Sequence, residues 1–187
     1  MLFFIFLAVV ITQRIIELVI AKRNERWLKK RGAIEFGKAH YRIIVFIHAL
    51  FFICLLFEVI YFKKELSFFW PLLLVLFLIT QAGRIWALTS LGRYWNTKII
   101  VLPGSEVVKK GPYQFMKHPN YVIVSLELLI VPLLFDAYIT ALLFSMLNAL
   151  ILSIRIPAEE KALKDLTEYD RRFAATNRFI PKNVNKV

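Results

Sequence analysis

The chain of 187 residues contains a single cysteine and only six glycines, and these two scarcities exclude several classes of protein. Cys54 alone cannot form a disulfide framework or a cysteine metal cluster. No two glycines stand in a G-x-G arrangement, so the chain can build neither a dinucleotide-binding fingerprint nor a phosphate-binding loop. A soluble nucleotide-binding fold of either kind is therefore excluded.

Acidic residues are also scarce, with 13 Asp and Glu against 25 Lys and Arg, which gives a net charge of +12. Hydrophobic residues make up 59% of the chain, compared with roughly 45–50% in a typical soluble domain. A nucleic-acid-binding protein needs its basic residues on a soluble face, and the apolar runs of this chain leave no such face. The combination is typical of a membrane protein with cationic loops beside anionic lipids.

Three apolar runs each approach the roughly 20 residues that a helix needs to cross a bilayer. They cover residues 2–20, 43–62 and 71–91. No basic region precedes the first run and no small-residue cleavage site follows it, so we expect a retained membrane helix rather than a signal peptide.

A fourth apolar region, residues 121–156, is too long for one span and slightly short for two. Pro132 and Asp136 stand at its middle, where a tight helical hairpin would turn. We prefer this hairpin of two short helices, and one long kinked helix is the alternative. The sequence thus predicts an all-α polytopic membrane helix bundle with about five transmembrane helices.

The basic residues cluster in alternate connections. Eight lie in residues 22–42, five in residues 93–117 and eight from residue 155 onward; the other four are Arg14, Lys63, Lys64 and Arg84. By the positive-inside rule, we expect the N-terminus outside and the basic loops and C-terminal tail in the cytoplasm.

Charges inside apolar spans are expensive, so we expect them to face other helices or water. Arg14 and Glu17 are three residues apart, which favours a helix-packing ion pair. Gln81 and Arg84 stand one turn apart near the cytoplasmic end of the third span, and both helix packing and a ligand contact remain open for them.

Residues 92–121 form a long basic connection whose last part, residues 111–121, contains two X-Pro bonds, before Pro112 and Pro119. Such bonds hold the preceding residue out of the helical region, which places Tyr113 and His118 on a stiff irregular loop. Backbone polar groups at membrane depth need partners, and a bound cofactor is one way to supply them. An ordinary turn packed on the bundle is the other interpretation.

Glu159 and Glu160 follow Pro157 and suit the first turn of a cytoplasmic helix, where the helix dipole favours negative charge. Apolar residues at three- and four-residue steps predict an amphipathic helix over residues 159–172. His40 and His48 lack companion ligands, so no metal site is predicted. The residues alone indicate a polytopic membrane protein with a polar pocket on the cytoplasmic side.

Several of these segments resemble the isoprenylcysteine carboxyl methyltransferase family. They are GPYQFMKHPNY at residues 111–121, RIPAEE at 155–160 and a tail with Tyr-Arg-Arg-Phe and Arg-Phe-Ile-Pro. The family signature is Arg-His-Pro-x-Tyr followed at a distance by Glu-Glu, and the resemblance covers residues 81–181. Lys117 departs from it, because a lysine keeps the charge of the usual arginine but not its planar fork.

The resemblance implies a cytoplasmic loop and helix that bind S-adenosylmethionine. The cofactor-binding residues would be Gln81, Tyr113, His118, Pro119, Tyr121, Glu159 and Glu160. Arg84 and Arg155 would bind the substrate, and Arg155 and Glu160 would be the catalytic residues. Residues 1–187 would form one integral membrane domain, with three transmembrane helices in residues 1–91 and the catalytic region in residues 92–187.

The expected activity is transfer of a methyl group from S-adenosylmethionine to a carboxylate or hydroxyl of a lipophilic acceptor. A long-chain polyketide or pyrone is favoured, and a prenylated cysteine carboxylate comes next. The expected surroundings are the bilayer of a bacterial plasma membrane, with no nucleic-acid partner. The alternative is a non-catalytic small transporter or scaffold protein, in which the charges within the spans would line a route across the membrane.

Overall fold

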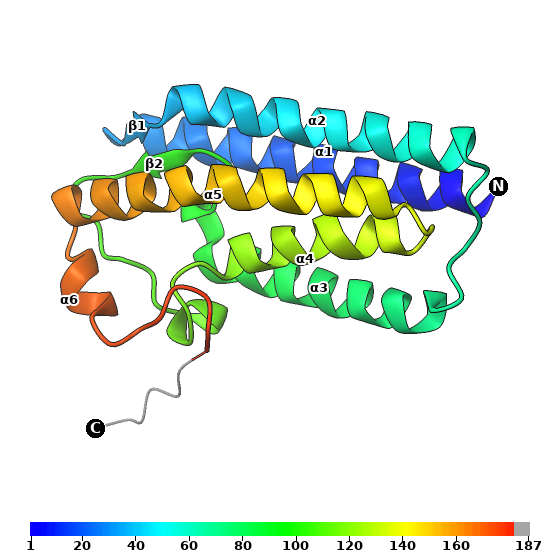
Figure 1. The fold of residues 1–187 in the computed structure, drawn as a ribbon. Coiled ribbons are helices and arrows are strands. Elements are labelled where there is room, and N and C mark those ends of the chain that lie inside the picture. Colours follow the sequence, from blue (N-terminus) through cyan, green and yellow to red (C-terminus); the bar gives the residue numbers. More distant parts are fainter. Residues whose placement is uncertain (182–187) are drawn as a thin grey trace.

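The computed structural model describes residues 1–181 as a bundle of long helices with a small irregular region at one end (Figure 1). The helices are α1 (Leu2–Lys29), α2 (Lys38–Tyr61), α3 (Trp70–Leu91), α4 (Pro119–Leu133), α5 (Tyr138–Leu166) and the short α6 (Tyr169–Phe173). The predicted all-α polytopic bundle is confirmed. α1, α2, α3 and α5 are long and apolar enough to cross a membrane. α4 has 15 residues, about 22 Å of helix, which is shorter than a hydrocarbon core of about 30 Å.

The predicted helical hairpin is formed by α4 and α5. Pro132 lies in the last turn of α4, and Asp136 adopts a left-handed backbone conformation in the turn that follows. Glu58 of α2 fixes the start of α5, because its carboxylate accepts the backbone N–H of Ile139 at 3.1 Å and that of Thr140 at 2.7 Å. A carboxylate at a helix N-terminus satisfies otherwise unpaired donors and suits the helix dipole. The alternative of one long kinked helix is therefore wrong.

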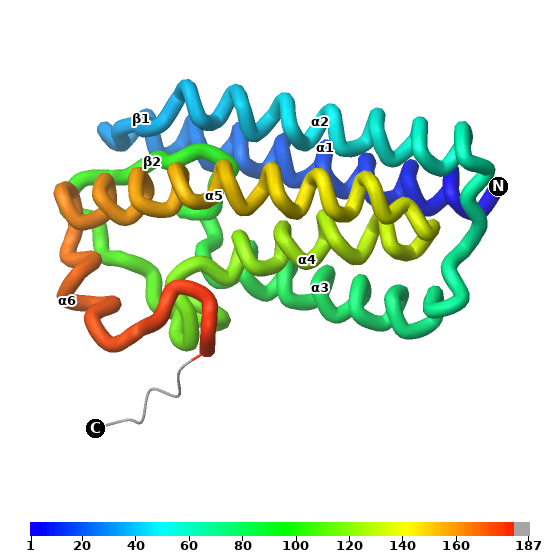
Figure 2. The backbone as a smooth tube through the Cα atoms, in the orientation of Figure 1, coloured from blue at the N-terminus to red at the C-terminus, as the bar shows by residue number. Residues whose placement is uncertain are grey.

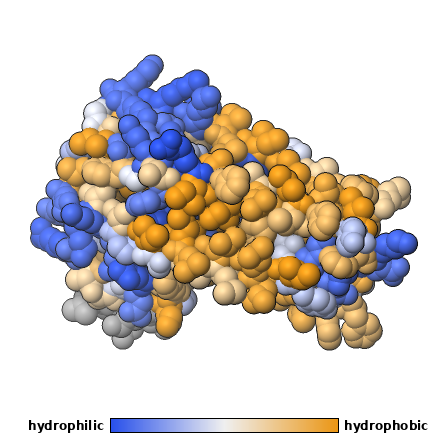
Figure 3. Space-filling view, turned by 45° about the horizontal axis from the view of Figure 1, so that its top comes forward, coloured by the Kyte–Doolittle hydropathy of each residue, from blue (hydrophilic) through white to orange (hydrophobic). Residues whose placement is uncertain are grey.

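Apolar side chains cover the outside of the bundle as well as its core. Phe144 packs edge-on against Phe51 inside, whereas Phe46 and Ile53 are more than 60% exposed on the surface of α2. In Figure 3 an apolar band separates two hydrophilic ends. An exposed apolar surface of this extent would be costly in water, and a bilayer covers it, as expected for an integral membrane protein.

The two ends of the bundle differ. The N-terminus lies with the α2–α3 connection and the α4–α5 turn, whereas the opposite end carries α6 and two short strands (Figure 2). These strands, β1 (Ile34–Phe36) and β2 (Ile99–Val101), pair antiparallel. The sequence does not predict this sheet, because three-residue strands carry little local signal and their pairing joins distant segments. We call this end the basic end, since it holds the connections at residues 22–42 and 93–117.

Two predicted boundaries are corrected. α1 continues to Lys29, so the first basic residues after Ile20 lie on helix rather than on a loop. α5 continues through Pro157 to Leu166, and the separate amphipathic helix predicted over residues 159–172 is not formed. A proline inside a helix removes one hydrogen bond, and tertiary packing compensates here. The extension of α5 packs against the sheet, where Ala162 forms a buried apolar cluster with Ile99 and Val101 of β2.

Candidate functional site

A buried polar network joins α1, α3 and α4 within the apolar part of the bundle. Glu127 of α4 accepts hydrogen bonds from Gln81 at 2.7 Å and Arg84 Nε at 3.0 Å. Arg14 Nη2 of α1 also donates to Glu127, at 2.8 Å. Glu17 accepts from Arg14 at 2.7 Å and from Arg84 Nη1 at 3.0 Å. Three helices are thereby connected through two carboxylates.

The charges of this network balance, with two arginines against two glutamates. Burying an ion costs several kcal/mol unless a partner compensates it, so the pairing makes these charges compatible with the membrane. The ion pair expected for Arg14 and Glu17 is confirmed. Gln81 and Arg84 direct their donors at carboxylates of neighbouring helices. These contacts correspond to the helix-packing interpretation of the two residues. A contact of either residue with a ligand stays a prediction.

A second polar cluster lies at the basic end, where α4 begins. His118 is the N-cap residue of α4 and Pro119 occupies the first turn. The His118 side chain is buried, and its Nε2 lies 3.0 Å from Oε1 of Glu160. Glu160 belongs to the extension of α5 beyond Pro157, so the continuous helix brings the Glu-Glu motif to the His-Pro motif.

The C-terminal segment closes over this pair. Arg178 donates from Nε and Nη2 to the two carboxylate oxygens of Glu160, at 2.9 and 2.7 Å. The backbone N–H of Lys117 donates to the Asn177 carbonyl at 2.9 Å, and that of His118 donates to the Arg178 carbonyl at 3.1 Å. The hydrogen bond with Glu160 raises the pKa of Arg178, which keeps the guanidinium charged. Arg178 was not among the predicted site residues, although the Arg-Phe-Ile-Pro tail contains it.

A second set of contacts connects the same two motifs. The Tyr121 hydroxyl donates to the Glu159 carboxylate and accepts from Arg155 Nε at 2.9 Å. Arg155 Nη2 donates to the carbonyl of Thr97 at 2.5 Å. Arg155 is thereby fixed at two of its nitrogens, and its side chain is buried.

Four buried polar atoms around this cluster have no hydrogen-bond partner within residues 1–181. They are Arg155 Nη1, Asn120 Oδ1, Tyr169 Oη and Thr176 Oγ1. An unpaired buried donor or acceptor costs about 1–3 kcal/mol. The set comes from α4, α5, α6 and the C-terminal segment and includes donors and acceptors. Such a set suits a ligand that offers both kinds of group.

Tyr113 lies in the loop before His118, within a short 3₁₀ helix at Gly111–Gln114. It is buried beside Ala87 and Ile123, between α3 and α4. Burial raises the pKa of Tyr113, and the nearby Glu159 carboxylate raises this pKa further. The hydroxyl therefore stays neutral at physiological pH and can act as a hydrogen-bond donor.

Gly111 begins this 3₁₀ helix with φ of +55°, a conformation that favours glycine. A Cβ atom at this position would lie 2.0 Å from Ser90 Oγ and 2.8 Å from Trp86 Nε1. The loop is thus held directly against α3, as the interpretation of a stiff irregular loop requires.

Lys117 stands at the position where the sequence departs from the family signature. Its Nζ lies 5.6 Å from the centre of the Tyr169 ring, a cation–π contact that a lysine ammonium can make. Burial and then the Glu160 carboxylate raise the pKa of Tyr169, so this ring too carries a neutral hydroxyl.

The predicted site residues thus separate into two groups. Five of them form two hydrogen-bonded sets at the basic end, one of His118 and Glu160 and one of Tyr121, Arg155 and Glu159. The ring centres of His118 and Tyr121 lie 5.3 Å apart, so the two sets are adjacent, and we call the five residues together the His-Glu cluster. Pro119 and Tyr113 lie beside it on the same connection and helix start. Gln81 and Arg84 belong to the network around Glu127, which is two turns further along α4 than Tyr121.

Comparisons with known proteins identify the family of the chain. The profile of the isoprenylcysteine carboxyl methyltransferase (ICMT) family matches residues 72–165, which is half of the chain. A Bacillus subtilis (strain 168) protein, the uncharacterized protein YpbQ, is 52% identical over 88% of this chain and 98% of its own length. An uncharacterized Haemophilus influenzae protein is 30% identical over 85% of this chain and 93% of its own length. The chain belongs to the isoprenylcysteine carboxyl methyltransferase family.

Proposed function

We propose that the protein is an integral membrane O-methyltransferase that uses S-adenosylmethionine and acts on a lipophilic acceptor. The observation that carries this proposal is the His-Glu cluster, in which the His-Pro and Glu-Glu motifs meet around buried polar atoms that have no partner in the described part of the chain. Family membership supports methyl transfer as the reaction class.

The residues of the His-Glu cluster fit the chemistry of S-adenosylmethionine. The cofactor has an ammonium group and ribose hydroxyls that donate hydrogen bonds, and Glu159 and Glu160 are the acceptors for them. Tyr169 Oη and Thr176 Oγ1 have no partner among residues 1–181 and can pair with its other polar atoms. When bound, the cofactor supplies a methyl group on a positively charged sulfur. The protein's own task is to bind, orient and exclude water.

Arg155 is the residue best placed to hold the acceptor. Tyr121 and Thr97 fix two of its nitrogens, so the third, Nη1, has a fixed direction and no partner within residues 1–181. A carboxylate acceptor is ionised at neutral pH and would bind Arg155 by a charge-assisted hydrogen bond without needing a general base. A phenol or enol acceptor would instead have its oxyanion stabilised by the same nitrogen.

The bundle's surface supports a proposal for the acceptor class and for the orientation in the membrane. The exposed apolar band lets a long lipid tail lie in the bilayer, while the basic end faces the aqueous phase that supplies the cofactor. We favour a long-chain polyketide or pyrone as the acceptor, with a prenylated cysteine carboxylate second. We place the basic end in the cytoplasm and the N-terminus outside a bacterial plasma membrane. The bacterial origin of both relatives supports this membrane.

The test is methyl transfer to an unknown acceptor in a complete lipid mixture. Purified protein in lipid nanodiscs is incubated with methyl-labelled S-adenosylmethionine and a total bacterial lipid extract, and mass spectrometry identifies what gains the label. We expect label in one lipophilic species and a strong loss of label with Arg155→Ala. Absence of label in every lipid and peptide fraction, with folded protein, would contradict the proposal.

The transporter or scaffold alternative finds no support in the charges within the spans. Arg14, Glu17, Arg84 and Glu127 pair with one another across three helices. Residues paired in this way do not line a polar route along the bundle, which is what transport requires.

A further inference from the structure

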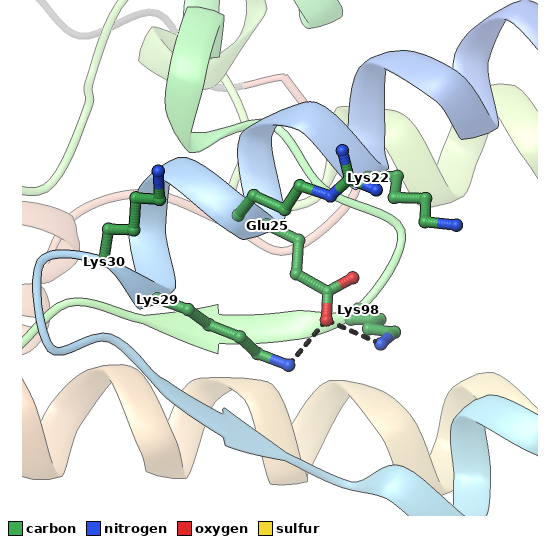
Figure 4. Close-up of a pocket in the computed structure, with 6 residues that line it drawn as sticks. Lys22, Glu25, Lys29, Lys30 and Lys98 are labelled. Atoms are coloured by element: carbon green, nitrogen blue, oxygen red, sulfur yellow. Dashed lines mark hydrogen bonds and ion pairs between the residues drawn. The ribbon is translucent and has the colours of Figure 1, made fainter.

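A separate cationic surface lies on α1, at its basic end. An open depression there is lined by Lys22, Glu25, Arg26, Lys29, Lys30 and Lys98 (Figure 4). Figure 4 shows the Glu25 carboxylate between the ammonium groups of Lys29 and Lys98. None of these residues belongs to the His-Glu cluster or to the network around Glu127.

Two of the five cations are neutralised by carboxylates. Lys29 lies 2.6 Å from Glu25 and 2.5 Å from Glu35. Lys98 lies 2.8 Å from Glu25 and 3.4 Å from Glu35. The hydrogen bond to Glu25 raises the pKa of Lys98, so its charge persists. Two ammonium groups and two carboxylates therefore balance one another and connect α1 to β1 and to the residue that precedes β2.

The other three cations are uncompensated. Lys22, Arg26 and Lys30 are exposed, and no carboxylate of residues 1–181 lies within 4 Å of their charged groups. They recur every four residues, so they lie on one side of the helix axis over about 12 Å. We call these three residues the α1 cationic ridge.

The ridge continues an apolar stripe of the same helix face. Leu18 and Val19 precede Lys22 by one turn and are 49% and 63% exposed, and Ile15, one turn earlier, is 55% exposed. Acyl chains would contact this stripe, and the cations begin directly beyond it, at the depth of lipid phosphates. A free phosphate ion would use the cations alone, whereas a phospholipid uses both parts of the face.

We propose that the α1 cationic ridge binds the phosphate group of an anionic phospholipid of the surrounding bilayer. The neutralised pairs around Glu25 hold the ridge in place. Asn24, on the opposite face of α1, donates to the Trp95 carbonyl at 2.8 Å, and Asn96 donates to the Ala21 carbonyl at 3.1 Å. A lipid bound here therefore also stabilises the segment that contains Thr97, the partner of Arg155.

The test compares two double variants that remove equal charge at opposite ends of the bundle. Lys22→Gln/Arg26→Gln alters the ridge, and Lys63→Gln/Lys64→Gln is the matched control. Each protein is released from nanodiscs that contain equal amounts of phosphatidylglycerol and phosphatidylcholine. Native mass spectrometry then counts the lipids of each kind that the protein retains. We expect wild type and control to retain phosphatidylglycerol selectively and the ridge variant to lose about tenfold in this selectivity.

Three results would overturn the proposal. One is equal phosphatidylglycerol retention by the ridge variant and wild type. Another is an equal loss in the control, which would indicate diffuse electrostatic attraction. The third is displacement of the lipid by inorganic phosphate at the same molar concentration, which would indicate a site for the free anion. Circular dichroism of both variants checks that the exposed substitutions leave the helices folded.

Discussion

Arg178 donates to both carboxylate oxygens of Glu160, at 2.9 and 2.7 Å, and thereby fixes the C-terminal segment to the end of α5. The same carboxylate faces His118 Nε2 at 3.0 Å. Two residues from other parts of the chain, His118 and Arg178, thus converge on Glu160. The candidate cofactor site depends on this convergence, because no single segment contains it.

The first prediction concerns the pair of hydrogen bonds from Arg178 to Glu160. Arg178→Ala leaves Glu160 without two charge-assisted hydrogen bonds, so we expect S-adenosylmethionine to bind about tenfold more weakly. Isothermal calorimetry measures the change. Arg171→Ala is the matched control, because Arg171 is highly exposed and meets Glu168 only at 3.6 Å. Equal affinities for the Arg178 variant and wild type would show that the two hydrogen bonds from Arg178 to Glu160 are not needed for cofactor binding.

A second prediction separates cofactor binding from turnover. Arg155→Ala removes Nη1, which no described residue of the chain pairs with, but no carboxylate of the site, so we expect near-normal cofactor affinity. Methyl transfer should fall by about 10²-fold, the typical loss on removing one donor to an oxyanion. The rate of label incorporation into the lipid extract measures this loss. Arg155→Lys keeps the charge but not the geometry, and full activity in that variant would contradict a positioned donor.

The network inside the membrane gives a third prediction. Glu127→Ala leaves Arg14 and Arg84 with only Glu17, and removing one partner of a buried ion pair typically costs about 3–5 kcal/mol. We expect a lower midpoint of thermal unfolding in detergent. Combining Glu127→Ala with Arg84→Ala should recover part of the loss, since one uncompensated charge disappears. Additive effects in this double-mutant cycle would contradict direct coupling.

The fourth prediction tests the close contact of the loop with α3. Gly111→Ala places a methyl group 2.0 Å from Ser90 Oγ, so either the loop that holds Tyr113 and His118 or the facing side chains of α3 must shift. Gly104→Ala is the matched control, because Gly104 also has positive φ but no atom lies within 4 Å of its Cβ position. We expect Gly111→Ala to lower thermal stability and cofactor affinity more than Gly104→Ala. Similar effects for both would assign the loss to backbone conformation alone.

The sequence predicts the parts of the fold that depend on local patterns. Long apolar runs predict α1, α2 and α3, and Pro132 with Asp136 predicts the hairpin turn. The two strands were missed, because the pairing of Ile34 with Val101 is a long-range contact between very short segments. The continuation of α5 through Pro157 was missed for the same reason, since packing on that sheet overrides the local effect of a proline.

The candidate site likewise has residues that local motifs predict and residues that only the folded arrangement shows. The contiguous motifs at residues 111–121 and 155–160 predict His118, Tyr121, Arg155, Glu159 and Glu160, and the structure brings these five side chains together. Arg178 lies near the C-terminus, and its pairing with Glu160 depends on how the tail returns to the bundle. The partners of Gln81 and Arg84 on α1 and α4 likewise follow only from the arrangement of helices.

The most direct test of the central claim is calorimetry of S-adenosylmethionine binding to the purified protein in nanodiscs, with Glu160→Gln beside wild type. Glu168→Gln, which changes an exposed carboxylate outside the His-Glu cluster, is the matched control. We predict saturable one-to-one binding by wild type and control and an affinity about tenfold lower for Glu160→Gln. Absence of binding to folded wild-type protein, or equal affinities in all three proteins, would contradict the account.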